Sequence, residues 1–173
     1  MIKYLIIYCH PWPKSFNHAI LEAIIKNLEE HNQSYRVIDL YAERFDPVYD
    51  ETGAGTVKYL LMLANCERLI LVLPIWHNGI PGLLKGFIYK LKRVSGGQRN
   101  LTNIKQALIL STSSTPTFYY KYLGGNILKK DLIKRTLKPL GIKKVRWINF
   151  GSSSRSTKDR REKFLMRVSN LNL

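Results

Sequence analysis

The chain has 173 residues, of which 45% are hydrophobic and 23% are charged. This composition is typical of a folded globular protein and excludes intrinsic disorder as a description of the whole chain. At about 100 to 200 residues per domain, the length predicts a single domain over residues 1–173. No apolar run approaches the roughly 18 residues that span a bilayer, and the apolar N-terminal run leads into no small-residue cleavage site. We therefore expect a soluble, cytoplasmic protein.

Charge is distributed unevenly along the chain. With 28 Lys+Arg against 12 Asp+Glu, the formal net charge is +16 at pH 7. Residues 1–84 hold 7 basic and 9 acidic side chains, whereas residues 85–173 hold 21 and 3. Such a surplus of positive charge suits three kinds of partner: nucleic acid, an anionic membrane surface or a phosphorylated ligand. The two cysteines, Cys9 and Cys66, lack the spacing of a metal site or a disulfide framework, so we expect neither.

The first third of the chain has the pattern strand, helix, strand. Residues 2–8 form an apolar run that is rich in β-branched and aromatic residues, too short for a typical helix and closed by the turn-forming residues 10–13. Ser15 stands where a helix N-cap belongs. An apolar stripe at helical spacing follows it, formed by Ile20, Leu21, Ile24, Ile25 and Leu28. A second strand is predicted at 35–40.

The middle of the chain repeats this alternation. A helix is predicted over about 56–66, followed by the strand 68–74, whose almost continuous apolarity is typical of a strand covered on both faces. Pro81 suits the first turn of the next helix. The apolar face of that helix consists of Leu84, Phe87, Ile88 and Leu91, and Gly96-Gly97 are expected to end it.

The last third adds strands at 106–112 and 145–150. Between them a helix is predicted over about 126–138, and a final amphipathic helix over about 157–170 has Thr157 as its cap. Residues 151–154 are the one linker-like patch and are expected to let the last helix swing across the sheet edge. Five buried strands that alternate with helices predict an α/β three-layer sandwich around a parallel sheet.

Three loops are candidates for a ligand site, because ligands of open parallel sheets bind outside the carboxyl ends of the strands. The first loop, residues 10–17, contains a capping Ser and an Asn at the start of a helix, which suits a phosphate. The second, 74–81, combines an aromatic side chain, two hydrogen-bonding side chains and a Gly, which suits a flat heteroaromatic ring. The third, 111–120, is dense in hydroxyls. No G-x-G-x-x-G and no P-loop motif is present.

At these residues the chain resembles the flavodoxin-like NAD(P)H:quinone oxidoreductase family, which is related to FMN-dependent azoreductases and NADPH-dependent FMN reductases. The motifs that carry the resemblance are His10-Pro11 with Ser15-Phe16-Asn17, Asp39-Leu40-Tyr41 with Phe45-Asp46-Pro47, and Pro74 followed by Pro81-Gly82-Leu83-Leu84-Lys85-Gly86. Their order and spacing match the family over nearly the whole chain.

The resemblance implies a five-stranded parallel sheet of order 2-1-3-4-5, bound FMN or FAD, and a homodimer with the site at the subunit interface. The chain is shorter than the eukaryotic members of the family, which favours FMN over FAD. The resemblance also implies two-electron reduction of a quinone, azo compound or flavin by NADH or NADPH. Residues that match cofactor-binding positions of the family are His10, Ser15, Phe16, Asn17, Pro74, Ile75, Trp76, His77, Thr112, Ser113, Ser114 and Thr115. Backbone N–H groups of Trp76 and His77 are expected to reach the flavin ring.

Several residues keep two interpretations. His77 is a candidate proton donor to the reduced acceptor, because histidine titrates near neutral pH. It is equally well interpreted as a solvated loop residue. Tyr119 either closes over the acceptor or is an ordinary surface tyrosine. Trp76 either contacts flavin or packs in the core or at a dimer interface, and Cys9 is interpreted as buried packing.

The sequence also leaves alternative functions open. The third loop reads Ser113-Ser114-Thr115-Pro116 where the family usually has a Gly pair. This departure favours a second hypothesis, a non-enzymatic regulatory flavoprotein that is an ancillary subunit of a membrane transport system. Nucleic-acid binding through the basic half has no recognition motif to support it, and peripheral membrane contact stays open.

Overall fold

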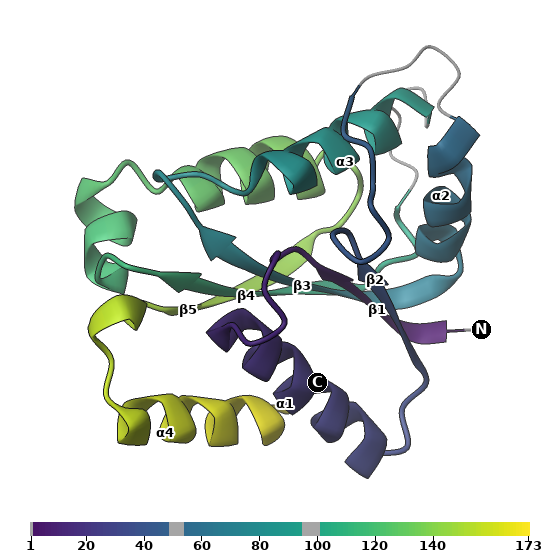
Figure 1. Cartoon of the computed structure of the whole chain (residues 1–173). Helices are drawn as coiled ribbons and strands as arrows, with labels where there is room; N and C mark the ends of the chain where they lie inside the picture. The colour runs from purple at the N-terminus through teal and green to yellow at the C-terminus, as the bar shows by residue number, and fades with distance from the viewer. Residues whose placement is uncertain (1, 49–53, 95–100) are drawn as a thin grey trace.

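The computed structural model describes residues 2–48, 54–94 and 101–173. Five strands form one parallel sheet in the order β2-β1-β3-β4-β5 (Figure 1). They are β1 (Ile2–Tyr8), β2 (Tyr35–Asp39), β3 (Cys66–Ile75), β4 (Gln106–Ser113) and β5 (Lys144–Phe150). The predicted strand order is confirmed, and β3 is longer than predicted at both ends.

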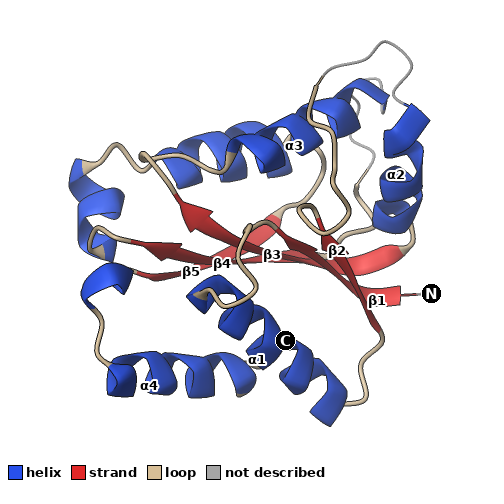
Figure 2. Cartoon of the chain, in the orientation of Figure 1, coloured by secondary structure: helices blue, strands red, loops and turns tan. Residues whose placement is uncertain are grey.

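Helices cover both faces of the sheet, as the prediction of three layers requires (Figure 2). On one face α1 (Phe16–Glu30) and α4 (Lys158–Ser169) pack together. On the other lie α2 (Val57–Ala64), α3 (Gly82–Val94) and the helix η3 (Leu128–Leu137). Short helical turns η1 (Ala54–Thr56), η2 (Tyr119–Leu123) and η4 (Ser153–Arg155) lie in the connections.

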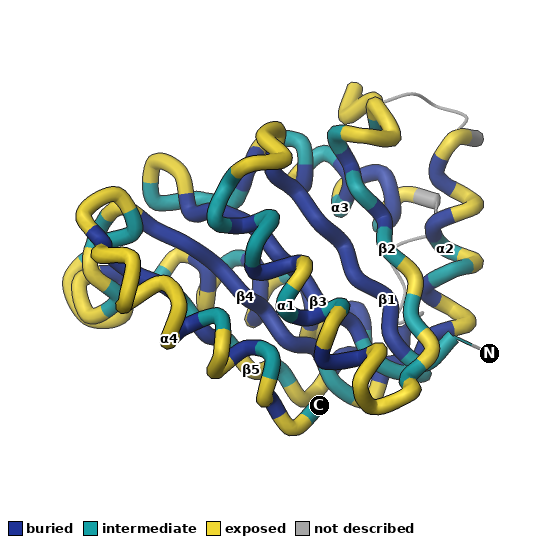
Figure 3. The backbone as a smooth tube through the Cα atoms, turned by 60° about the horizontal axis from the view of Figure 1, so that its bottom comes forward, coloured by how far each residue is buried: buried dark blue, intermediate teal, exposed yellow. Residues whose placement is uncertain are grey.

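The hydrophobic core is divided by the sheet into two clusters, and Figure 3 shows that the central strands are buried along most of their length. Successive side chains of β1 alternate between the clusters: Leu5 and Ile7 pack toward α2 and α3, whereas Ile6 and Tyr8 pack toward α1 and α4. Burial on both faces explains why these strands read as continuous apolar runs.

Both predicted helix caps are confirmed. The Ser15 hydroxyl accepts the N–H of His18 at 3.1 Å, and the Thr157 hydroxyl accepts the N–H of Arg160 at 3.3 Å. The expected stop of α3 at Gly96-Gly97 lies outside the described residues.

The helix predicted over about 126–138 is present, but it is wound more widely than an α-helix. In η2 and η3 the backbone bonds join residues five apart: Gly124 N–H donates to the Tyr119 carbonyl, and Lys138 N–H donates to the Ile133 carbonyl at 3.0 Å. Such π-helical turns are rare and are often found at functional sites.

The prediction that residues 151–154 form a linker that lets the last helix swing is wrong. Gly151 is buried against the loop after β4, where an added Cβ would come within 2.5 Å of the Thr117 nitrogen. Residues 153–155 form the turn η4, and α4 is fixed against α1. The glycine is therefore required for a close approach of two chain segments rather than for freedom of the last helix.

None of the helices in the described ranges combines the length and hydropathy that crossing a bilayer needs. In the same ranges, no group of three or more His, Cys, Asp or Glu side chains is placed to hold a metal ion.

Candidate functional site

The three candidate loops lie together at the carboxyl edge of the sheet. The parallel register places Tyr8 of β1 beside Val72 of β3, and Val72 beside Leu110 of β4. Because β3 runs on to Ile75 and β4 to Ser113, Pro74, Ile75, Thr112 and Ser113 are strand residues whose backbone is paired in the sheet. The loops proper begin after Tyr8, Ile75 and Ser113.

The first loop ends in the N-terminus of α1, whose first backbone N–H groups are free in the described part of the chain. The Ser15 hydroxyl and carbonyl both accept the N–H of His18. Among the described residues, no group accepts the N–H of Phe16 or of Asn17. These two N–H groups and the positive end of the helix dipole are therefore available to a phosphate.

Asn17 joins the first loop to the third. Its side chain is only 3% exposed, and its Nδ2 donates to the Thr112 hydroxyl oxygen at 2.9 Å. Its Oδ1 is buried and has no hydrogen-bond partner in the described part of the chain. A buried acceptor without a partner is costly, so this oxygen can accept a hydroxyl or N–H that a ligand or a water brings to this position.

His10 joins the first loop to the second. Its ring lies 5.6 Å from the ring of Trp76, centroid to centroid, and its Nδ1 accepts the N–H of Trp12 at 3.2 Å. That bond leaves the proton on Nε2, which can donate to a ligand. Burial lowers the pKa of His10, because the charged imidazolium loses solvation there, and this favours the neutral ring.

The second loop opens with a two-residue hairpin. Trp76 N–H donates to the Gly79 carbonyl at 3.0 Å, and Gly79 N–H donates to the Trp76 carbonyl at 2.8 Å. His77 and Asn78 between them have φ of 46° and 62°, as a type I′ turn requires.

This hairpin corrects one expectation. The N–H of Trp76 is used inside the turn, so it cannot reach a flavin ring, whereas the N–H of His77 has no acceptor among the described residues. The indole of Trp76 is exposed and contacts His10, so it is not a core side chain, and His77 is exposed as well.

The third loop is supported by a partly buried hydrogen-bond network that was not predicted from the sequence. Asn149 of β5 donates from Nδ2 to the hydroxyls of Ser113 and Thr117, both at 2.9 Å, and its Oδ1 accepts the hydroxyl of Ser111 at 2.8 Å. The Ser113 hydroxyl in turn donates to the carbonyl of Thr115 at 2.8 Å. An Asn inside an apolar strand was the available signal. The network holds Ser113 in the frame of the loop, which leaves Ser114 exposed at its tip.

The rings of Phe16 and Tyr119 pack against residues outside the predicted site. The ring of Phe16 packs against Phe150, at 4.6 Å between centroids, and Phe164, at 6.1 Å, so only its backbone faces the ligand loops. Tyr119 lies on η2, half-exposed, with its ring edge-on to buried Tyr120. Cys9 is fully buried, which confirms its interpretation as packing.

A parallel five-stranded sheet with helices on both faces and three loops at its carboxyl edge defines an open α/β sandwich. The model of a protein family described by its flavodoxin-like fold matches residues 2–171. The chain belongs to this family.

Individual proteins agree with this assignment. An uncharacterized NAD(P)H oxidoreductase from Haemophilus influenzae is 25% identical over 169 residues, which cover 87% of this chain and 84% of the relative. An NAD(P)H:quinone oxidoreductase from Methanothermobacter marburgensis superimposes with a TM-score of 0.86 at 21% identity, covering 97% of this chain and 94% of that one. An FMN-dependent NADH-azoreductase from Bacillus anthracis, solved in complex with FMN, superimposes with a TM-score of 0.74 at 16% identity, covering 98% and 96%.

Proposed function

We propose that the protein is a flavin oxidoreductase that binds FMN in the three loops and transfers a hydride from NADPH or NADH to a quinone, an azo compound or a flavin. The observation that carries the proposal is Asn17, whose buried amide ties the first loop to the third and keeps one oxygen without a partner. The family and the names of its relatives support the reaction class.

The residues of the site fit FMN part by part. The free N–H groups of Phe16 and Asn17, together with Nε2–H of His10, suit the phosphate. The unpartnered oxygen of Asn17 suits a hydroxyl of the ribityl chain. The exposed indole of Trp76 and the free N–H of His77 suit the edge of the ring.

When bound, FMN supplies the acceptance and release of a hydride, which no side chain of the protein can do. The chain's own part is to bind, to orient and to provide a proton. Reduction of a quinone to a hydroquinone takes up a proton with each hydride, and we assign its delivery to the imidazole of His77 or the hydroxyl of Tyr119. Ser114 and Thr115 would border the ring from the side opposite Trp76.

A visible absorption spectrum tests the proposal. Purified protein incubated with FMN and desalted should retain the flavin absorption, and anaerobic addition of NADPH or NADH should bleach it. Protein that stays colourless after incubation with FMN would refute flavin binding.

A matched pair of variants tests the position of the cofactor. Asn17→Asp keeps the size of the side chain and places a negative charge among the groups proposed to hold the ribityl and phosphate end of FMN, so FMN affinity should fall at least tenfold. Asn32→Asp makes the same change beyond the other end of α1 and should leave FMN affinity within twofold. Equal effects of the two variants would remove Asn17 from the site.

A regulatory flavoprotein is the second candidate, and the third loop favours it. Buried Ser113, held by Asn149, stands where the family's Gly pair usually lets the backbone approach the flavin. Retained FMN that neither NADPH nor NADH bleaches would support this candidate against the oxidoreductase.

We also propose a homodimer. Phe118 of the third loop is 60% exposed, and Leu123, just after the loop, is 69% exposed. Exposed apolar side chains that gather near a site favour a second protein surface over them. Light scattering after gel filtration should give twice the mass of the 20.1 kDa chain, and replacing both side chains with Ser should return the protein to the monomer.

A further inference from the structure

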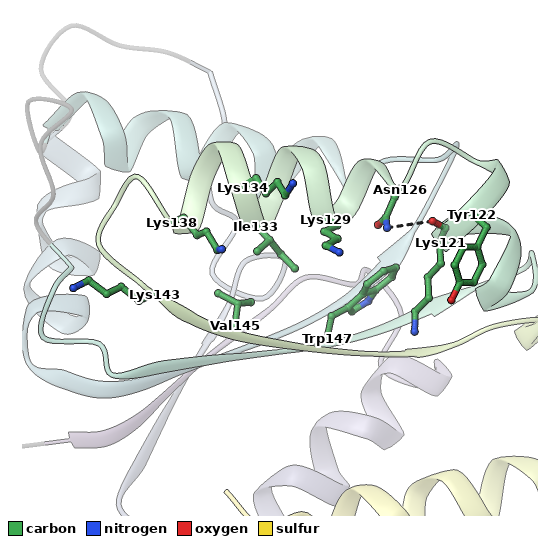
Figure 4. A pocket seen from close by; sticks show the side chains of 10 residues that line it. All are labelled: Lys121, Tyr122, Asn126, Lys129, Ile133, Lys134, Lys138, Lys143, Val145 and Trp147. Atoms are coloured by element: carbon green, nitrogen blue, oxygen red, sulfur yellow. Dashed lines mark hydrogen bonds between the residues drawn. The ribbon is translucent and has the colours of Figure 1, made fainter.

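A concave site lies between η3 and the edge strand β5 (Figure 4). Its volume is about 520 Å³, within the range of small-molecule sites, which is about 300–1,000 Å³. None of the residues that line it belongs to the first or second ligand loop or to the 111–115 stretch. Half of its ten lining residues are lysines: Lys121, Lys129, Lys134, Lys138 and Lys143.

The wide winding of η3 explains why three of these lysines line one groove. In an α-helix, residues nine positions apart are separated by two and a half turns of 3.6 residues and point in opposite directions. Bonds between residues five apart widen the turn, which brings Lys138 back to the side of Lys129, with Lys134 between them. Lys121 comes from η2, and Lys143 precedes β5 (Figure 4).

The groove has no negative charge of its own. No acidic residue lines it, and none of its five lysines forms an ion pair with a carboxylate in the described ranges. The one acid of η3, Asp131, instead pairs with Lys85 of α3 at 3.8 Å. Like charges that share a concave surface repel one another, and a bound polyanion relieves that repulsion.

One wall of the groove is apolar and rigid. It contains Val145 and Trp147 of β5 and Ile133 of η3. The indole Nε1 of Trp147 donates to the Ser111 hydroxyl at 2.8 Å, which fixes the orientation of the ring, and Lys121 Nζ lies 6.0 Å from its centroid. A planar apolar group can lie against this wall while an anionic group extends toward the lysines.

We infer that the groove is a second ligand site, separate from the flavin site, which binds a nucleotide that carries two or more phosphates. The phosphates contact Lys129, Lys134 and Lys138, and the base lies against Trp147. One or two phosphates neutralise only part of the positive charge of the groove lysines. A nucleotide with one phosphate therefore binds more weakly than a triphosphate. The inference does not rest on flavin binding and holds whether or not FMN occupies the three loops.

The test uses the whole chain, labelled with ¹⁵N and titrated with ATP in about 150 mM salt, where long-range attraction is screened beyond about 8 Å. The chain has 3 tryptophans, and the variants Trp12→Phe and Trp76→Phe assign the third indole N–H signal to Trp147. ATP should shift the Trp147 signal in a saturable manner. Tripolyphosphate should bind at least fivefold more weakly, and adenosine should not bind.

Two double variants test the lysines. Lys134→Ala/Lys138→Ala should weaken ATP binding at least tenfold. Lys158→Ala/Lys163→Ala removes the same charge from α4, where these side chains are 90% and 75% exposed, and should change the affinity less than twofold. All four substitutions are at exposed positions, so both proteins should fold, and circular dichroism checks this.

Four outcomes would overturn the inference. ATP binding that leaves the Trp147 signal unchanged would place the nucleotide elsewhere. Equal loss in both double variants would mean attraction by net charge alone. Tripolyphosphate that binds as tightly as ATP would remove recognition of the base, and an oligoribonucleotide that binds the groove lysines more tightly than ATP would make the surface an RNA site.

Discussion

The bond between Asn17 and Thr112 makes a quantitative prediction about how the ligand loops are held. Thr112→Val keeps the shape of a buried side chain and removes only the hydroxyl that accepts Asn17 Nδ2. Because Asn17 Oδ1 already has no partner, the whole buried amide is then unsatisfied. Leaving a buried donor unpaired costs about 1–3 kcal/mol.

In a domain of this size each 1 kcal/mol lowers the Tm by about 2–4 °C. The variant without ligand should therefore melt about 2–12 °C lower in a thermal scan followed by circular dichroism. Thr115→Val is the matched control, because the Thr115 hydroxyl forms no hydrogen bond among the described residues, and its stability should stay within about 0.5 kcal/mol of the parent. If Thr112→Val were as stable as this control, the amide would not hold the two loops together.

Three other predictions follow from single contacts. In Gly151→Ala the added methyl group would displace the loop at Thr117, which should lower the free energy of unfolding in urea by about 1–3 kcal/mol and weaken FMN binding. An unchanged urea midpoint would contradict the close approach of Gly151 and Thr117. Burial raises the pKa of the Cys9 thiol to about 12, so iodoacetamide at pH 8 should leave Cys9 unmodified in the native protein, and rapid alkylation read by mass spectrometry would show that the strand end opens. Burial lowers the pKa of His10 below its ordinary value of about 6.5. On acidification the unfolded chain therefore takes up a proton before the folded protein does, and the free energy of unfolding should fall as the pH drops from 7.5 to 5.5. His10→Asn should reduce this fall, and an equal fall in both proteins would show that the pKa is not lowered.

The strands and helix starts were predictable because their signals are local. A strand buried on both faces needs a continuous apolar run, and the runs beginning near residues 2 and 68 meet that need. Ser15 and Thr157 are caps whose hydroxyls act within one turn of the chain. Parallel pairing then places the loops at one edge without further information.

The winding of η3 was not predictable from its apolar pattern. The buried residues Leu128, Leu132, Ile133 and Leu137 are spaced by one and four positions, which suits an α-helix and a wider helix equally. Only the bonded backbone distinguishes the two, because hydrophobic spacing reports which side faces the core and not how many residues complete a turn.

The missed parts of the site depend on contacts between distant segments. Asn149 and Ser113 are 36 positions apart, and Gly151 and Thr117 are 34 apart, so no local pattern shows which residue each of them contacts. The turn at His77-Asn78 is different, since Asn followed by Gly is a recognisable turn signal, yet it did not reveal that the N–H of Trp76 would be used inside the turn.

The lysines beside β5 have a consequence for solubility as well. β5 is an outer strand of the sheet, paired only with β4 among the described residues, so one side of its backbone can accept a strand from another molecule. Lys144 and Arg146 are exposed along it, and Lys143 directly precedes it. If the β5 edges of two molecules met, their positive side chains would face and repel one another, which disfavours a continuous sheet between molecules. Variants that neutralise this edge should therefore aggregate at lower protein concentration than the parent, even where their fold is intact.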